Sequence, residues 1–194
     1  IFRMIYLDEN KLIGKGSERS CYYHPNHEDY CIKVIHTMSK RSIIRSDREI
    51  NYIRKYKSKK SPFKEIPDYY GSVQTNIGKG YIFERVKDWN GKNSIKLSEY
   101  IKEESNSENI RLMIVDMYNS FLKHRALVSD LHSGNIVVNL KTPEACPKLI
   151  LIDGIGNSDF IKISDYSYYL LKKKLIRKFS RMMHNLKISN KGIQ

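Results

Sequence analysis

The sequence predicts an α+β fold, in which a strand-rich first part with one helix is joined by a linker to a mainly helical second part. Short runs of β-branched and aromatic residues, separated by polar turns, indicate the strands. Farther along, apolar residues recur at helical spacing from Ile110 to Leu122, which indicates a helix with one buried face. Hydrophobic residues make up 40% of the 194 residues, enough to bury a core, and the chain has no run of about 18 apolar residues that would span a membrane.

The first part is predicted to hold short strands and one helix. Strands are expected at 12–13, 19–23, 30–35, 69–74 and 80–86. The polar run 24–29 joins two of them as a hairpin. A basic amphipathic helix is expected over 39–57, with an apolar side made of Ile43, Ile50, Ile53 and Tyr56. The turn 14–17, Gly-Lys-Gly-Ser, suits a flexible backbone.

The second part begins after a linker at 89–93. Its clearest element is the helix with the apolar stripe, and Ser105 and Glu108 are predicted to form a capping box at its start. Two apolar strands are expected at 136–138 and 148–152, and a basic helical tail follows them.

The formal net charge of +14 indicates either an anionic partner or a generally lysine-rich composition. Basic residues concentrate at 40–60 and 172–181. We expect the tail to pack one side on the second part. The alternative is that the basic residues of the tail form a surface that binds an anionic substrate, the phosphate acceptor, or membrane headgroups. Binding of headgroups would allow peripheral membrane contact. Lys174 and Lys178 stand four residues apart and are expected to share an exposed face.

The three cysteines do not make a disulfide framework, because their number is odd and the chain is long for one. A reducing, cytoplasmic location fits this cysteine usage best. A zinc site is a competing interpretation of one stretch, whose ligand types and close spacing run Cys21, His24, His27 and Cys31.

Asp130, Asn135 and Asp153 carry the strongest chemical signal. Asp130 and Asn135 stand five positions apart before one apolar strand, and Asp153 ends the next strand. Phosphoryl transfer needs one carboxylate to orient the attacking hydroxyl, and an amide oxygen and a second carboxylate to hold Mg²⁺ against the phosphates. Two adjacent strands can aim these groups at one point. We therefore predict that Asp130 orients an acceptor hydroxyl and that Asn135 and Asp153 bind Mg²⁺, although the first two residues alone could be a capped turn.

The first part supplies residues suited to the phosphates of ATP. Gly14, Gly16 and Ser17 could let backbone amides approach phosphates, although such a glycine pair is often only a hairpin turn. Lys33, in Cys-Ile-Lys-Val, has the place of the kinase lysine that pairs with the α- and β-phosphates. Strand alternation puts Cys31 on the same face, where it would line an adenine pocket.

Further candidates complete the nucleotide site. Glu49 on the following helix is the candidate ion-pair partner of Lys33, and the alternative is a capping box with Ser46. In the run Tyr-Ile-Phe-Glu-Arg-Val, Phe83 is predicted to be the gatekeeper residue. The backbone of Glu84 and Val86 would then be the hinge that meets adenine.

These signals follow the order that they have in protein kinases: glycine loop, lysine, helix glutamate, hinge, catalytic loop and metal aspartate. We therefore predict one kinase-like domain over 1–194, with an N-lobe at 1–87, a reduced C-lobe at 88–194 and ATP·Mg²⁺ between them. The expected activity is transfer of the γ-phosphate to a hydroxyl of a protein, glycan, lipid headgroup or small molecule. The alternatives are an ATP-binding regulator without catalysis and a basic nucleic-acid-binding module. Nucleic acid is the less expected partner because no recognisable motif for it is present.

Four stretches stand out beyond these signals: Arg19-x-Cys21-Tyr22-x-His24-Pro25, Ile66-Pro67-x-Tyr69-x-Gly71, Gly80-Tyr81-Ile82-Phe83 and Asp88-Trp89-Asn90-Gly91-Lys92-x-Ser94-Ile95-x-Leu97. With them the chain resembles the YrbL family, a bacterial group of the kinase-like superfamily linked to the PhoP regulatory network. The resemblance covers roughly 10–185. It implies a kinase-like fold and a cytoplasmic kinase, and it does not supply a substrate.

The chain also departs from protein kinases. Val128-Ser129 stands where they have His-Arg before the catalytic aspartate, and Asp153-Gly154-Ile155-Gly156 replaces D-F-G. The form D-L-H-x-G-N, with His132, is similar to aminoglycoside and other small-molecule kinases. Only 38 residues follow Gly156, so we expect a reduced activation segment. Asp165 is the candidate to brace the catalytic loop.

Activity is expected not to depend on phosphorylation of an activation segment. Ser129 occupies the place of the arginine that would read such a phosphate. Phosphatase treatment of the purified protein should therefore leave the rate of phosphoryl transfer unchanged. A loss of roughly tenfold or more after treatment, equal to about 1.4 kcal/mol of barrier, would overturn this expectation.

Overall fold

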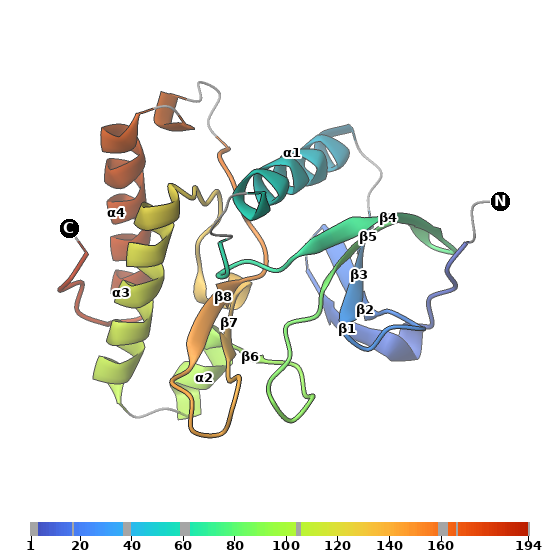
Figure 1. The fold of residues 1–194 in the computed structure, drawn as a ribbon, viewed down its shortest axis with the longest axis horizontal. Helices are drawn as coiled ribbons and strands as arrows, with labels where there is room; N and C mark the ends of the chain where they lie inside the picture. Colours follow the sequence, from blue (N-terminus) through green and yellow to red (C-terminus); the bar gives the residue numbers. More distant parts are fainter. Residues whose placement is uncertain are drawn as a thin grey trace. The chain divides into compact units, whose positions relative to one another are not determined.

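The structure is a computed structural model that describes residues 4–16, 18–36, 40–58, 63–103, 106–158, 163–165 and 167–193 (Figure 1). The chain forms two compact units. Unit 1 comprises Ile1–Arg54 with Pro67–Val86, and unit 2 comprises Lys55–Ile66 with Lys87–Gln194. The segment 55–66 lies inside the range predicted for the N-lobe and groups with the later residues. Strands dominate unit 1 and the long helices α3 and α4 lie in unit 2, as expected for the predicted α+β class.

The described part of unit 1 contains an antiparallel five-stranded sheet in the order β1-β2-β3-β5-β4. Its elements are η1 Glu9–Lys11, β1 Leu12–Lys15, β2 Arg19–Tyr23, β3 Tyr30–Ile35, β4 Tyr69–Thr75, β5 Gly78–Glu84 and most of α1 Lys40–Lys57, whose last three residues belong to unit 2. The predicted hairpin of β2 and β3 has the predicted bounds. Strand β5 begins and ends two residues earlier than predicted, and just beyond its end the amide of Arg85 donates to the carbonyl of Asp29 at 2.7 Å.

The two faces of this sheet differ in character. Ile32 and Val34 of β3 pack with Leu7 and Tyr22 in a buried apolar cluster. Because side chains alternate along a strand, the residues between them lie on the opposite face. Lys33 is paired there with Tyr81 of β5, and Cys31 is paired with Phe83. The predicted shared face of Cys31 and Lys33 is therefore present.

Helix α1 buries a mixed stripe. Its second half buries the predicted apolar residues Ile50, Ile53 and Tyr56. Its first half buries polar side chains instead, namely Ser42, Ser46 and Glu49, whereas Ile43 is only half-buried. A search for apolar periodicity could not find this polar half of the stripe.

Unit 2 combines three helices with a small antiparallel sheet in the order β6-β7-β8, as far as its residues are described. Its elements are β6 Ile95–Lys96, α2 Leu97–Glu103, α3 Ser107–His124, η2 Ser133–Asn135, β7 Ile136–Asn139, β8 Lys148–Leu151, η3 Ile163–Asp165 and α4 Tyr168–Asn185. The helix α3, the strands β7 and β8 and the helical tail follow the prediction. The short elements β6 and α2 were not predicted.

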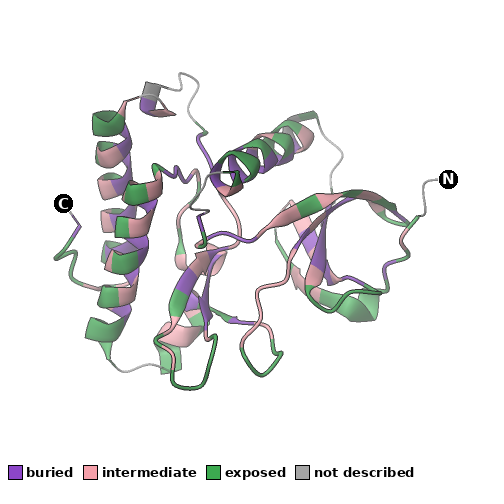
Figure 2. Cartoon of the chain, in the orientation of Figure 1, coloured by how far each residue is buried: buried purple, intermediate pink, exposed green. Residues whose placement is uncertain are grey.

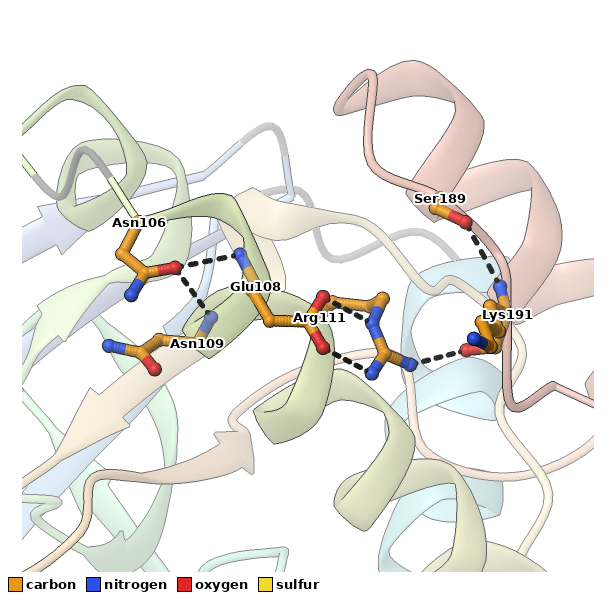
Figure 3. Close-up of polar contacts among 6 residues, drawn as sticks. All are labelled: Asn106, Glu108, Asn109, Arg111, Ser189 and Lys191. Atoms are coloured by element: carbon orange, nitrogen blue, oxygen red, sulfur yellow. Dashed lines mark hydrogen bonds and ion pairs between the residues drawn. The ribbon is translucent and has the colours of Figure 1, made fainter.

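The predicted capping box of α3 is wrong. Ser105 lies outside the described residues, and the cap is Asn106, whose side-chain oxygen accepts from the amides of Glu108 and Asn109 at 3.0 and 3.3 Å (Figure 3). The carboxylate of Glu108 instead accepts two hydrogen bonds from the guanidinium of Arg111. Arg111 also donates to the carbonyl of Lys191 at 2.6 Å, which ties the segment after α4 to the first turn of α3.

Helices α3 and α4 pack through aromatic rings. The ring of Phe179 on α4 lies 5.3 Å from Tyr118 and 5.7 Å from Phe121 of α3, measured between centroids. Helix α4 thus has one buried and one exposed side (Figure 2). No helix within the described stretches is long and apolar enough to cross a membrane.

The expected exposed face of Lys174 and Lys178 is wrong. Lys174 is buried and donates to the side-chain oxygen of Asn157, and Lys178 is half-buried and donates to the carbonyl of Ser129 at 2.6 Å. Both lysines follow a buried leucine by three positions, so helical geometry turns them inward. The outward cations are Lys173, Arg177 and Arg181.

Replacing the hydroxyl of Tyr56 should destabilise unit 2. This hydroxyl accepts from the buried amide of Leu127 at 2.9 Å, and burial raises the pKa of Tyr56. Tyr56→Phe leaves that amide without its acceptor, so the free energy of unfolding in urea should fall by about 1–3 kcal/mol. The same change at exposed Tyr169 should alter it by less than about 0.5 kcal/mol. Equal effects of the two variants would contradict this assignment.

Candidate active site

Two loops of unit 2 meet through their backbones. We call 128–135 the Asp130 loop and 152–156 the Asp153 loop. The amide of Ser129 donates to the carbonyl of Gly154 at 2.7 Å, and the amide of Ile152 donates to the carbonyl of Asn135 at 2.8 Å. Val128 and Ile155 form a β-bridge next to the first of these bonds. The two loops are therefore held together at both ends of the Asp130 loop.

Asp130 and Asn135 are joined directly. The side-chain amide nitrogen of Asn135 donates to the backbone carbonyl of Asp130 at 3.2 Å and lies 3.4 Å from its carboxylate oxygen Oδ2. The nitrogen of the Asn135 side chain thus points to Asp130. The oxygen Oδ1 of Asn135 is then the atom that could face a cation. The Asp130 side chain is 69% exposed, so a molecule in solution can reach its carboxylate.

Gly154 allows the close approach of the Asp153 loop. Its φ of +80° is in the left-handed region, and a Cβ added there would lie 2.5 Å from the carbonyl oxygen of Asp130. Its carbonyl accepts from both the amide and the hydroxyl of Ser129, and more weakly from the amide of Asp130 at 3.3 Å. Its own amide donates to the Asp153 carboxylate at 2.7 Å. A phenylalanine, as in D-F-G, would not fit this position.

His132 lies beside the Asp130 carboxylate. Its Nδ1 accepts from the amide of Gly134 at 3.1 Å, so the proton of the neutral ring is on Nε2. That nitrogen is 3.7 Å from Oδ2 of Asp130. The sequence marked His132 only as a departure from protein kinases, and the fold now places it in the site.

The Asp130 loop is braced by a residue that the sequence analysis did not propose. Lys178 of α4 donates to the carbonyl of Ser129, the residue before Asp130. The predicted brace, Asp165, accepts at 2.6 Å from the side-chain nitrogen of Asn157, and the side-chain oxygen of Asn157 accepts from Lys174. The sequence predicts that the basic tail packs on the second part or forms a charged surface. Only the contacts of α4 show that Lys178 braces the Asp130 loop.

In unit 1, Lys33 is 9% exposed, and its ammonium lies 4.8 Å from the centroid of the Phe83 ring. Glu49 is buried and its carboxylate accepts from Arg19 of β2 at 2.7 Å. The pairing of Lys33 with Glu49 stays a prediction, and Arg19 is a partner that the sequence analysis missed. The alternative capping box of Ser46 and Glu49 is wrong, since both residues lie inside α1.

The turn between β1 and β2 has space for an added Cβ at Gly14. The amide of Gly16 donates to the carbonyl of Arg19 at 2.8 Å, which closes the turn. Neither Gly14 nor Gly16 has a positive φ, and a Cβ added to Gly14 would meet no atom within 4 Å. The packing of the protein itself therefore does not require glycine at position 14, whereas close approach of a ligand would. Ser17 lies outside the described residues.

The predicted adenine-pocket and hinge residues are neighbours within unit 1. The sulfur of Cys31 lies 3.8 Å from the carbonyl oxygen of Glu84. A hydrogen bond with Cys21 and burial raise the pKa of the Cys31 thiol well above its ordinary value, so it stays protonated. The amide of Glu84 donates to the carbonyl of Asp68 at 2.9 Å, and Val86 is half-buried two residues later.

The donor set at the two loops suits Mg²⁺. Magnesium bound with a nucleotide takes one or two carboxylates, phosphate oxygens and water, all of them hard oxygen ligands. Asp153 and Asn135 offer a carboxylate and an amide oxygen on adjoining loops. Across the described ranges, which include Cys21, His24, His27 and Cys31, no group of three or more His, Cys, Asp or Glu side chains is placed to hold a metal.

Comparison with known proteins agrees with this architecture. The family model described as PhoP regulatory network protein YrbL matches residues 5–187. Proteins described as "Uncharacterized protein YrbL" from Escherichia coli K12 and Shigella flexneri are each 27% identical over 184 residues, which is 93% of this chain and 87% of theirs. A kinase domain solved by crystallography superposes with a TM-score of 0.56 at 18% identity, over 82% of this chain and 55% of its own. The fold is kinase-like, and the chain spans about half the length of that kinase domain.

Adding a methyl group at Gly154 should separate backbone strain from steric contact. Gly91, with φ +78° and nothing within 4 Å of an added Cβ, is the matched control for Gly154. Gly91→Ala should cost about 1–2 kcal/mol of unfolding free energy from the left-handed backbone alone. Gly154→Ala should cost clearly more and should speed amide hydrogen exchange in the Asp130 loop, because Asp130 must move. Similar losses and exchange rates in both variants would show that the loops do not depend on this contact.

Proposed function

The chain belongs to the YrbL family of PhoP regulatory network proteins, and we propose that it is an ATP-dependent kinase. It would transfer the γ-phosphate of ATP to a hydroxyl of an acceptor that is not yet identified. The observation that most supports this proposal is the set of backbone bonds that hold Asp130 and Asn135 beside Asp153. The kinase-like fold adds support from an independent comparison.

In this proposal each residue of the two loops has a separate task. The exposed carboxylate of Asp130 orients the acceptor hydroxyl and takes its proton as its oxygen bonds to the γ-phosphorus, while the bond from that phosphorus to the bridging oxygen breaks and ADP leaves. The side-chain nitrogen of Asn135 holds Asp130 in place, and its oxygen and the carboxylate of Asp153 hold Mg²⁺. Bound Mg²⁺ neutralises the charge that develops on the phosphate oxygens.

The nucleotide is assigned to residues of unit 1. The ammonium of Lys33 is nearly buried, which strengthens its attraction to phosphate oxygens. The backbone of the turn at Gly14 and Gly16 would approach the same phosphates. Adenine would contact Cys31 and Phe83, which share the face of Lys33, and the hinge backbone of Glu84 and Val86.

Further features of the proposal concern location and partners. We propose a cytoplasmic enzyme whose acceptor is a protein, glycan, lipid headgroup or small molecule. An anionic acceptor or a membrane surface would meet the outward guanidinium groups of Arg177 and Arg181 on α4. An ATP-binding regulator without catalysis would use the same nucleotide residues and yield no phosphorylated product.

Mutation should separate nucleotide binding from transfer. Asp153→Asn removes a metal ligand, so it should weaken binding of Mg·ATP and abolish transfer. Asp130→Asn should keep the affinity for Mg·ATP within about twofold and lower transfer by about 100-fold or more, because the general base is lost. The measurements are calorimetric titration with Mg·ATP and transfer of γ-³²P from ATP with a cell extract as the acceptor source.

Two results would contradict the proposal in different ways. Wild-type protein that binds Mg·ATP and labels nothing would indicate the non-catalytic regulator. Asp130→Asn that transfers phosphate at the wild-type rate would show that the role given to Asp130 is wrong. Salt-dependent retention of mixed DNA and RNA on a filter, with no ATP binding, would support the nucleic-acid alternative instead.

A further inference from the structure

Helix α4 turns lysine side chains toward the candidate site. Lys178 donates to the carbonyl of Ser129 at 2.6 Å, and Lys174, one turn earlier, donates to the side chain of Asn157. These acceptors lie on the chain segments just before Asp130 and just after the Asp153 loop. One helix face thus contacts both parts of the site from within unit 2.

The contact of Lys178 fixes a particular peptide group. The peptide between Ser129 and Asp130 has its oxygen bonded to Lys178, while its N–H points to the carbonyl of Gly154 at 3.3 Å. A peptide group is planar, so bonds at both of its polar ends fix its orientation. That orientation sets the direction in which the Asp130 side chain leaves the backbone.

We propose that Lys178 is a positioning residue for the proposed phosphoryl transfer, a built-in cation that holds the Asp130 loop without any modification. This inference rests on the proposed kinase function. Protein kinases that are switched by phosphorylation carry an arginine before the catalytic aspartate to read the new phosphate. Here Ser129 stands at that place and contacts the Asp153 loop, and the cation comes from α4.

The use of a charged donor supports a positioning role. A bond from an ammonium to a carbonyl is roughly twice as strong as one between neutral groups. Ordering a lysine side chain costs conformational entropy, and water could satisfy a solvated carbonyl without that cost. Lys178 is half-buried, and its ammonium is held at the residue before Asp130.

The test compares Lys178→Met with Lys173→Met, which removes an outward lysine from the same helix. The probe reaction is Mg²⁺-dependent hydrolysis of ATP, in which water is the acceptor. Lys178→Met should lower kcat by about tenfold or more, equal to about 1.4 kcal/mol, and leave KM for ATP within about twofold. Lys178→Arg, which keeps a cationic donor, should recover part of kcat. Lys173→Met should match the wild type.

Amide hydrogen exchange tests the positioning role of Lys178 separately from the proposed kinase activity. Amides of 128–135 should exchange faster in Lys178→Met than in Lys173→Met, whether or not ATP is turned over. If the wild type hydrolyses no ATP, the kinase proposal fails and exchange alone decides the positioning role. Unchanged kcat and unchanged exchange in Lys178→Met would overturn the inference, as would a lower melting temperature with normal kcat. Should Lys178→Met not fold, Lys178→Gln takes its place in both measurements.

Discussion

The backbone bonds between the Asp130 loop and the Asp153 loop hold the candidate site together, and Gly154 is the residue that permits them. Its left-handed φ and its missing Cβ let its carbonyl reach the amide and hydroxyl of Ser129. With the loops held in this way, the side-chain nitrogen of Asn135 donates a hydrogen bond to the carbonyl of Asp130. A larger residue in place of Gly154 would separate the loops and with them the groups assigned to the acceptor and the metal.

Residues whose position follows from local pattern could be predicted from the sequence. The alternation of β3 placed Cys31 and Lys33 on one face, and the strands after Asn135 and before Asp153 were recognised from their apolar runs. The helical stripe from Ile110 to Leu122 likewise became α3. These features depend on periods of two or 3.6 residues, which a single sequence displays directly.

Partners that are distant in the sequence could not be predicted in this way. Arg19 meets Glu49 across 30 positions, and Lys178 meets Ser129 across 49. Arg19 stands in a short strand and Lys178 in a basic helix, and neither local pattern identifies the distant partner. The strand β6 has two residues, too few to show a period, and the cap Asn106 stands beside an equally plausible serine. Tertiary packing decides all of these cases.

A crystal structure of the protein with Mg²⁺ and a non-hydrolysable ATP analogue tests the central claim most directly. The account predicts a magnesium ion about 2.1 Å from Oδ1 of Asn135 and from a carboxylate oxygen of Asp153. It also predicts the γ-phosphate facing the carboxylate of Asp130. An analogue bound away from these residues, or bound there with its γ-phosphate turned away from Asp130, would contradict the account.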